Sequence, residues 1–236
     1  MTNIWAVATR ELRSYFLSPV AYLVAAFFVF GSGLLFWLIL QSNREASLRG
    51  LIQNVHVLFL FVVPMISMRL LAEEQRLGTM ELLMTNPIQE WEIVIGKFVG
   101  SALLIMSMLV ATLVFPFFLF IFGTPDVGPI LTGYLGAVLQ GSAFLAVGLL
   151  ASSLTESQIV SAVVSFVVLL ALWLSDNIGQ AAGGLFGQIV GYTSLINHIQ
   201  GFSQGVIDSK DVVFYLTVIG AGLVLSTLSL QSKRYR

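Results

Sequence analysis

Six stretches without a single charged side chain constrain this chain more than any other feature of its sequence. Each is long enough for the roughly 20 predominantly apolar residues that a helix needs to cross the hydrocarbon core of a bilayer. Charged residues make up only 10% of the 236 residues, whereas about a quarter of a soluble domain is charged. The sequence therefore predicts an all-α polytopic membrane protein and excludes a water-soluble enzyme. We expect one transmembrane domain over residues 1–236, with spans at about 20–40, 53–71, 98–122, 129–151, 157–175 and 212–231.

Two further facts of composition narrow the functional classes. The chain has no cysteine, so it forms neither a disulfide framework nor a thiolate metal site. Its net charge of −1 excludes a polybasic protein that binds nucleic acid. What remains is a protein that works in or beside the lipid bilayer.

The positions of lysine and arginine predict the orientation of the chain. An even number of spans places both termini on one side of the membrane, and eight of the eleven basic residues fall on that side. Basic residues in short loops are retained in the cytoplasm. We therefore expect both termini and the loop 71–97 to be cytoplasmic.

Two segments outside the spans are also predicted to be helical. Residues 4–16 place apolar and aromatic side chains on one side and arginines nearer the other, as in a helix that lies in the membrane interface. The alternative is that they form the start of one long first helix. Between spans five and six we expect two short external re-entrant helices, the first beginning at about Asn177 and the second covering about 194–204. The first carries glycines at a four-residue spacing that lets another backbone come close, although a flexible glycine-rich loop is the alternative. These are Gly179, Gly183, Gly187 and Gly191.

The loop between spans two and three carries five of the twelve acidic residues of the chain. We expect a helix end near Gly78 and then a short amphipathic helix over Thr79–Met84. A new helix is expected to start at Asn86-Pro87, with Gln89 as its third residue. An apolar helix face held off the membrane by charged flanks needs a protein partner to bury it. The alternative is an ordinary solvated connection.

Several short runs of residues resemble the ABC-2 family of transporter permeases. In the acidic loop, Ala72-Glu73-Glu74 leads to Gly78-Thr79-Met80-Glu81, Asn86-Pro87 and Gly96-Lys97. This order is similar to the double-glutamate, Gly-Thr-x-Glu, Pro and Gly-Lys pattern of the family. The runs Arg10-Glu11-Leu12, Ser18-Pro19, Asn197-His198 and Gly205-Val206-Ile207-Asp208 are similar to the branch that contains the gliding-motility permease GldF and the copper-site maturation permease NosY.

This resemblance implies a permease subunit with several partners. In the family, the acidic loop forms a coupling helix that docks on a separate ATPase, which holds ATP and Mg²⁺, so this chain itself would bind no cofactor. The docking contacts here would be Glu73, Glu74, Gly78, Thr79, Met80, Glu81, Leu83, Asn86 and Pro87. The permease would form a homodimer or a heterodimer, and the GldF-like branch implies an auxiliary GldG-like membrane protein with an external domain. ATP hydrolysis would drive export or transmit force across the membrane.

The residues give no sign of catalysis within the chain. The phosphate-binding pattern G-x-x-x-x-G-K-[ST] does not occur in it. Neither His56 nor His198 is expected to have a carboxylate neighbour or a second ligand at metal spacing. A secondary carrier or channel is the alternative to an ABC permease, but no predicted span carries a charged residue at mid-depth, which argues against a proton-coupled carrier.

Single cysteines introduced into this cysteine-free chain test the orientation. We expect Glu90→Cys to react with a membrane-impermeant maleimide only after the inner membrane is opened, because the basic residues retain that loop in the cytoplasm. Asp208→Cys should react in intact cells. Labelling of position 90 in intact cells contradicts the predicted orientation.

Overall fold

The computed structural model describes residues 2–43, 49–78, 88–123 and 125–234. In chain order the helices are α1 (Thr2–Leu17), α2 (Pro19–Asn43), α3 (Arg49–Ser67), α4 (Ala72–Arg76), α6 (Glu90–Ala111), α7 (Val114–Phe122), α8 (Val127–Leu154), α9 (Gln158–Ala182), α10 (Gly184–Tyr192), α11 (Leu195–Ser203) and α12 (Ser209–Arg234). No strand occurs within the described ranges. The predicted all-α class is therefore confirmed.

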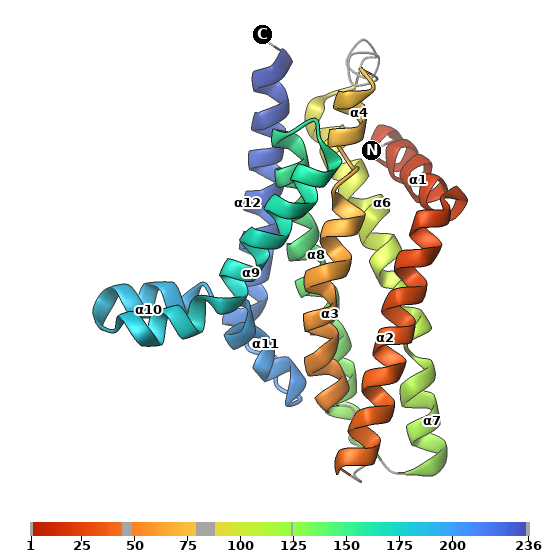
Figure 1. Ribbon diagram of the computed structural model, residues 1–236, viewed down its shortest axis with the longest axis vertical. Helices are drawn as coiled ribbons and strands as arrows, with labels where there is room; N and C mark the ends of the chain where they lie inside the picture. The colour runs from red at the N-terminus through yellow and green to blue at the C-terminus, as the bar shows by residue number, and fades with distance from the viewer. Residues whose placement is uncertain (1, 44–48, 79–87, 124, 235–236) are drawn as a thin grey trace.

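Six segments of the described chain are long and apolar enough to cross a membrane. They are Pro19–Gln41, Ile52–Arg76, Glu90–Phe122, Val127–Leu154, Gln158–Ala182 and Ser209–Lys233. The segments form a bundle with both termini at one end (Figure 1), which we call the terminal end, and the opposite end is the distal end. The prediction of six spans is confirmed, although several of them extend beyond their predicted bounds.

The third span is broken into α6 and α7 instead of forming one helix. Pro116 has no N–H, so it cannot donate a hydrogen bond to the Thr112 carbonyl one turn earlier. That carbonyl accepts from the N–H of Phe115 at 3.0 Å instead, and the Thr112 hydroxyl donates to the Leu109 carbonyl at 2.7 Å. The chain therefore makes a tight turn at Thr112 and Leu113 before α7 begins.

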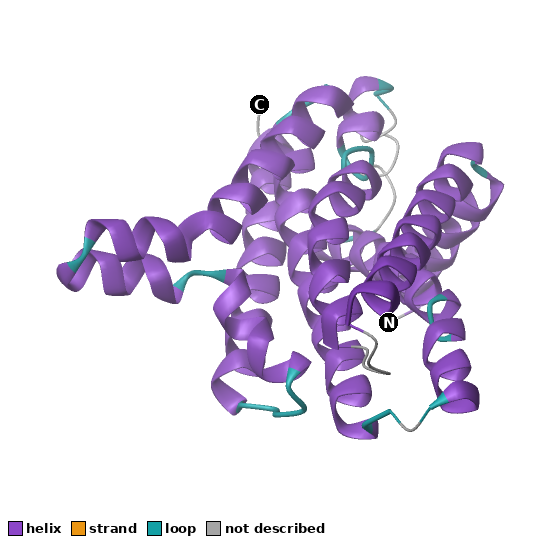
Figure 2. Cartoon of the chain, turned by 60° about the horizontal axis from the view of Figure 1, so that its bottom comes forward, coloured by secondary structure: helices purple, strands orange, loops and turns teal. Residues whose placement is uncertain are grey.

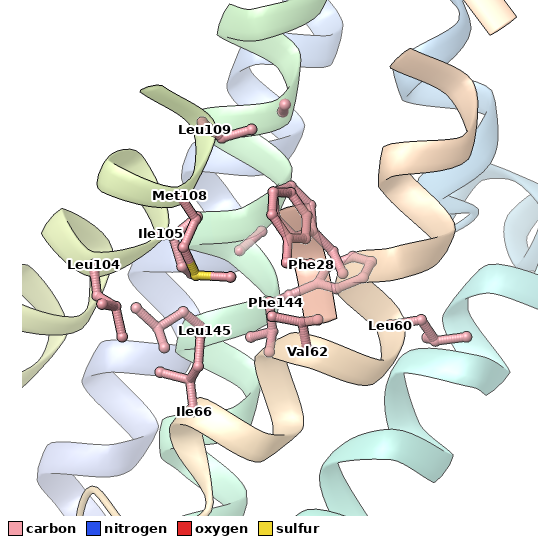
Figure 3. Close-up of a cluster of buried hydrophobic side chains, with 14 of the residues drawn as sticks. Phe28, Leu60, Val62, Ile66, Leu104, Ile105, Met108, Leu109, Phe144 and Leu145 are labelled. Atoms are coloured by element: carbon pink, nitrogen blue, oxygen red, sulfur yellow. The ribbon is translucent and has the colours of Figure 1, made fainter. Parts of the chain in front are cut away.

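The long helix α8 lies in the middle of the bundle, and small residues bring its neighbours close. A Cβ atom added to Gly133 would lie 2.4 Å from Ile52 of α3, and one added to Gly148 would lie 2.1 Å from the hydroxyl of Ser67. Around α8 the helices enclose a tightly packed apolar cluster, which Figure 3 shows with Phe144 at its centre. Helices in lipid associate largely through such close packing, because lipid itself is apolar.

Helix α1 is separated from α2 at Ser18 and lies across the terminal end of the bundle against α6 (Figure 1). Residues 4–16 are thus helical, as the sequence predicts. The location of α1 in a membrane interface stays a prediction.

The expectation of one glycine-lined external helix starting at Asn177 is wrong. Helix α9 continues through Asn177 to Ala182, and the chain then reverses at Gly183 and Gly184, whose φ angles are 63° and 61°. L side chains rarely adopt such positive φ values, so these two glycines form the turn and Gly183 faces no neighbour. The resulting hairpin of α9 and α10 projects sideways from the bundle (Figures 1 and 2). The second helix, α11, occupies the residues predicted for it.

Within the hairpin, glycines of α9 and α10 lie against each other. A Cβ atom on Gly179 would lie 2.6 Å from the Gly187 carbonyl oxygen and 2.8 Å from the Gly191 nitrogen. A Cβ atom on Gly187 would lie 2.3 Å from the Gly179 carbonyl oxygen. The two backbones therefore touch at a place where no larger residue fits.

Gly187→Ala tests this contact. We expect the added methyl group to separate α9 from α10, because overpacking against backbone atoms costs roughly 1–3 kcal/mol. Hydrogen–deuterium exchange over residues 184–192 should therefore become faster. The control is Gly220→Ala in α12, where nothing lies within 4 Å of an added Cβ and alanine favours the helix. Equal exchange of the hairpin in both variants contradicts the contact.

Candidate functional site

A buried lysine joins three helices at the terminal end. Lys97 of α6 is only 3% exposed. Its Nζ lies 3.0 Å from Glu11 Oε2 of α1 and 3.0 Å from Glu74 Oε1 of α4. Arg10 adds a longer contact of 3.9 Å to the same Glu74 oxygen. A buried charge is tolerated only when it is paired, so this group, which we call the ion cluster (Glu11, Glu74 and Lys97), holds α1, α4 and α6 together.

Two glycines on α6 allow α1 to come close enough for the ion cluster to form. A Cβ atom on Gly96 would lie 2.6 Å from the Val7 side chain, and one on Gly100 would lie 2.8 Å from the Ala8 carbonyl oxygen. Gly96 and Gly100 are four residues apart and so lie on one face of α6. Lys97 follows Gly96 directly, which places its side chain beside the same contact.

The start of α6 differs from the prediction at Asn86-Pro87. Gln89 is extended (φ −82°, ψ 148°) and precedes the first helical residue, Glu90, so it is the N-cap and not the third residue of the helix. Glu92 decides this boundary, because its carboxylate accepts the Gln89 backbone N–H at 3.0 Å. The same carboxylate accepts the Asn3 side-chain amide at 3.2 Å, which adds a second link between α1 and α6.

Tyr15 ties the other end of α1 to the bundle. Its buried hydroxyl donates to the Ile66 carbonyl of α3 at 3.2 Å and lies 3.2 Å from the Ser101 hydroxyl of α6. The guanidinium of Arg69 lies 4.6 Å from the centroid of the Tyr15 ring. Burial, and then the nearby Glu11 carboxylate, raise the pKa of the Tyr15 hydroxyl, so it stays protonated and keeps its donor.

The short helix α4 is also bound to α8 and α12. The Ser152 hydroxyl of α8 accepts the backbone N–H groups of Leu71 and Ala72 at 3.0 and 2.9 Å, where a helix start leaves donors without a partner. The Gln75 side-chain amide donates to the Ser153 carbonyl at 3.2 Å. Lys233 of α12 donates to the Gln75 side chain at 2.7 Å. α4 is therefore held by polar contacts from the ends of two spans and by the ion cluster.

The structure describes only part of the predicted docking contacts. Glu73 and Glu74 lie in the first turn of α4, and Gly78 follows its end with a φ of 67°, as expected near a helix end. Glu74 belongs to the ion cluster, and its side chain is only 13% exposed. The other predicted contacts, Thr79, Met80, Glu81, Leu83, Asn86 and Pro87, lie outside the described residues.

Three of the short runs that suggested a family meet in this one place. Arg10-Glu11, Glu73-Glu74 and Gly96-Lys97 are far apart in the sequence, yet their charged side chains form the ion cluster and its Arg10 contact. Sequence reasoning noted each run but missed their contact, and it missed Ser152 altogether. The one available signal was the Gly96–Gly100 spacing around Lys97, since small residues four apart mark a helix contact.

The expectation that His198 has no carboxylate neighbour is wrong. Its Nδ1 lies 2.7 Å from Asp211 Oδ1 of α12, and its Nε2 lies 2.9 Å from the Tyr192 carbonyl oxygen. The ring also stacks on Phe214, with centroids 3.9 Å apart. This group joins α11 to α12. Within the described ranges, no group of three or more His, Asp or Glu side chains is arranged to hold a metal ion.

Lys97→Met tests the ion cluster. We expect it to lower the free energy of unfolding by about 3 kcal/mol or more, because two largely buried carboxylates lose their shared partner. The matched control is Lys210→Met, which breaks a pair with Asp208 at 3.1 Å whose lysine side chain is 63% exposed. Such an exposed pair contributes roughly 0–1 kcal/mol. Denaturant unfolding in detergent measures both, and equal losses contradict the role of Lys97.

Comparison with known proteins completes the description of the chain. The chain matches the family described as "ABC-2 family transporter protein" over residues 5–229. Over 87 residues the chain is 33% identical to the probable multidrug ABC transporter permease YbhR of Escherichia coli K12, and equally to YbhR of Escherichia coli O157:H7. These alignments cover 37% of this chain and 23% of the relatives. Because the family match covers nearly the whole chain, this six-span helical protein belongs to the ABC-2 family of transporter permeases.

Proposed function

We propose that this chain is the permease subunit of an ABC transporter and that α4 transmits the closure of a separate ATPase subunit to the membrane helices. The family assignment supports a transmembrane permease. The observation that supports the coupling role is the set of polar contacts that hold α4 to its neighbouring helices, which we call the anchors.

The anchors would distribute a push on α4 over the bundle. Helix α4 ends at Arg76, directly before the segment 79–87 in which we place the docking helix. The ion cluster connects α4 to α1 and α6, Ser152 connects its start to α8, and Gln75 connects it to α12. The ion cluster and the Ser152 bonds are largely buried, so the helices that they join should move together, because separation would leave buried polar groups without a partner.

The exposed side chains near α4 suit a protein partner. Leu77 and Arg76 are exposed at the end of α4, and the Arg10 side chain is exposed beside it. An exposed aliphatic residue surrounded by charges resembles the rim and edge of a protein interface more than a lipid-facing surface. The ATPase would hold ATP and Mg²⁺, and this chain would take part in hydrolysis only by docking.

Several finer features belong to the same proposal. The termini would be cytoplasmic and the protein would reside in the bacterial inner membrane as a homodimer or heterodimer. Membership of the GldF/NosY-like branch is suggested by the short runs of residues given above. It implies a GldG-like auxiliary protein and makes force transmission an option in addition to export. YbhR is named a probable multidrug permease, and the short stretch it shares with this chain suggests export of small molecules as the other option.

The double variant Met80→Asp with Leu83→Asp tests the docking helix. We expect it to abolish co-purification of an ATPase and stimulation of ATP hydrolysis, because loss of one desolvated anchor already costs about 2 kcal/mol or roughly thirtyfold in affinity. The permease itself should still insert, since both positions lie outside the predicted spans. The control Glu90→Ala, at the start of α6, should have a mild effect.

Two results would overturn this proposal. One is a double variant that still recovers a fully stimulated ATPase. The other is a wild-type protein with which no ATPase co-purifies in any mild detergent. In either case the secondary carrier or channel becomes the better interpretation.

A further inference from the structure

A cavity of about 280 Å³ lies within the subunit between α3, α8, α9 and α11. Its polar lining consists of Gln53, His56, Gln140, Gln200 and Ser203, and Trp173 forms part of its wall together with aliphatic side chains. Gln53 and Gln200 are exposed, so the cavity opens to the surface at that side. His56, Gln140 and Ser203 are buried and form its inner part.

The inner part of the cavity contains polar atoms that the protein leaves unbonded. His56 is 3% exposed and Gln140 is 1% exposed. His56 and Gln140 lie beside each other, but neither ring nitrogen of His56, nor the side-chain oxygen of Gln140, has a hydrogen bond of normal geometry among the described residues. Buried polar groups are nearly always bonded, and polar residues inside membrane spans commonly mark the path or site of a ligand.

The composition of the lining restricts the ligand to one chemical class. No charged side chain lines the cavity in the described chain, and a charged ligand there would have no counter-ion. Glutamine amides offer both donors and acceptors, and a neutral imidazole offers one of each. The Gln140 oxygen, which lies beside the His56 ring, can accept a hydrogen bond from a ligand donor. Trp173 offers a flat apolar surface.

We propose that this cavity binds an uncharged small molecule that carries hydroxyl or amide groups on an aromatic or aliphatic frame. The volume greatly exceeds the roughly 30 Å³ that one water occupies, so it has room for such a molecule. The site is formed by one subunit and lies apart from the ion cluster. Binding to it can therefore be measured on the permease alone, without an ATPase.

Equilibrium dialysis of the purified chain in lipid nanodiscs tests the site. The probe is radiolabelled 4-hydroxyacetanilide, which is neutral and carries a hydroxyl and an amide on one ring. Its matched anion is 4-hydroxyphenylacetate. We expect saturable binding of the neutral probe at one molecule per chain, and at least about tenfold weaker binding of the anion, because the cavity offers it no counter-ion.

Variants locate the binding within the cavity. Gln140→Met keeps the length of the side chain but removes its polar atoms, and it should weaken binding about tenfold or more because a hydrogen-bonded group loses its partner. Gln200→Met changes an exposed rim residue and should weaken binding severalfold. Ile196→Trp should block binding by filling the cavity. The control is Gln188→Met, an exposed residue of α10 outside the cavity, which should leave binding unchanged.

The inference is overturned by any of three results. The first is that the neutral probe shows no saturable binding, which would mean that the cavity holds only water. The second is that the anion binds as well as the neutral probe. The third is that the cavity variants bind the probe as the wild type does. If Gln140→Met does not fold, Gln200→Met and Ile196→Trp decide the question. The outcome is separate from that of the docking test, because this binding is measured on the permease alone.

Discussion

The pairing of the buried Lys97 with Glu11 and Glu74 is the interaction on which the terminal end of this protein depends. An ammonium group removed from water keeps its charge only if carboxylates approach it closely. Here the carboxylates come from α1 and α4, so pairing the charge also fixes these two helices against α6. Gly96 and Gly100 make this pairing possible, because a larger residue at either position would hold α1 away from α6.

Polar side chains inside the bundle differ in the hydrogen bonds that they form. Most serine and threonine hydroxyls donate to a carbonyl of their own helix three or four residues earlier, as Ser165 and Ser226 do. Ser152 instead bonds another segment and so connects α8 to the start of α4. The His56 ring and the Gln140 oxygen lie beside each other without a hydrogen bond of normal geometry among the described residues. Ion pairs and hydrogen bonds that join several helices at the terminal end suit a mechanical connection, whereas polar side chains around a cavity are typical of a binding site.

Much of the fold was predictable, because the length and apolarity of a membrane span are local properties of the sequence. The six spans, the helical N-terminal segment and α11 were predicted close to their observed places. Boundaries were less accurate. The third span breaks at Thr112 since Pro116 removes a donor, and α6 starts at Glu90 since Glu92 accepts the Gln89 N–H. Such choices depend on one hydrogen bond, which apolar periodicity does not report.

The sequence by itself determined that this is a six-span helical membrane protein, and its short runs of residues pointed to the right family. Only the tertiary structure decided which of those runs meet. Glu11 and Lys97 are 86 residues apart, and His198 finds Asp211 only because α11 packs beside α12. Likewise, the turn at Gly183 divided one predicted glycine-lined helix into a hairpin. The physical reason is that hydropathy depends on each residue alone, whereas the partner of a buried charge or of a close backbone contact depends on how distant helices pack.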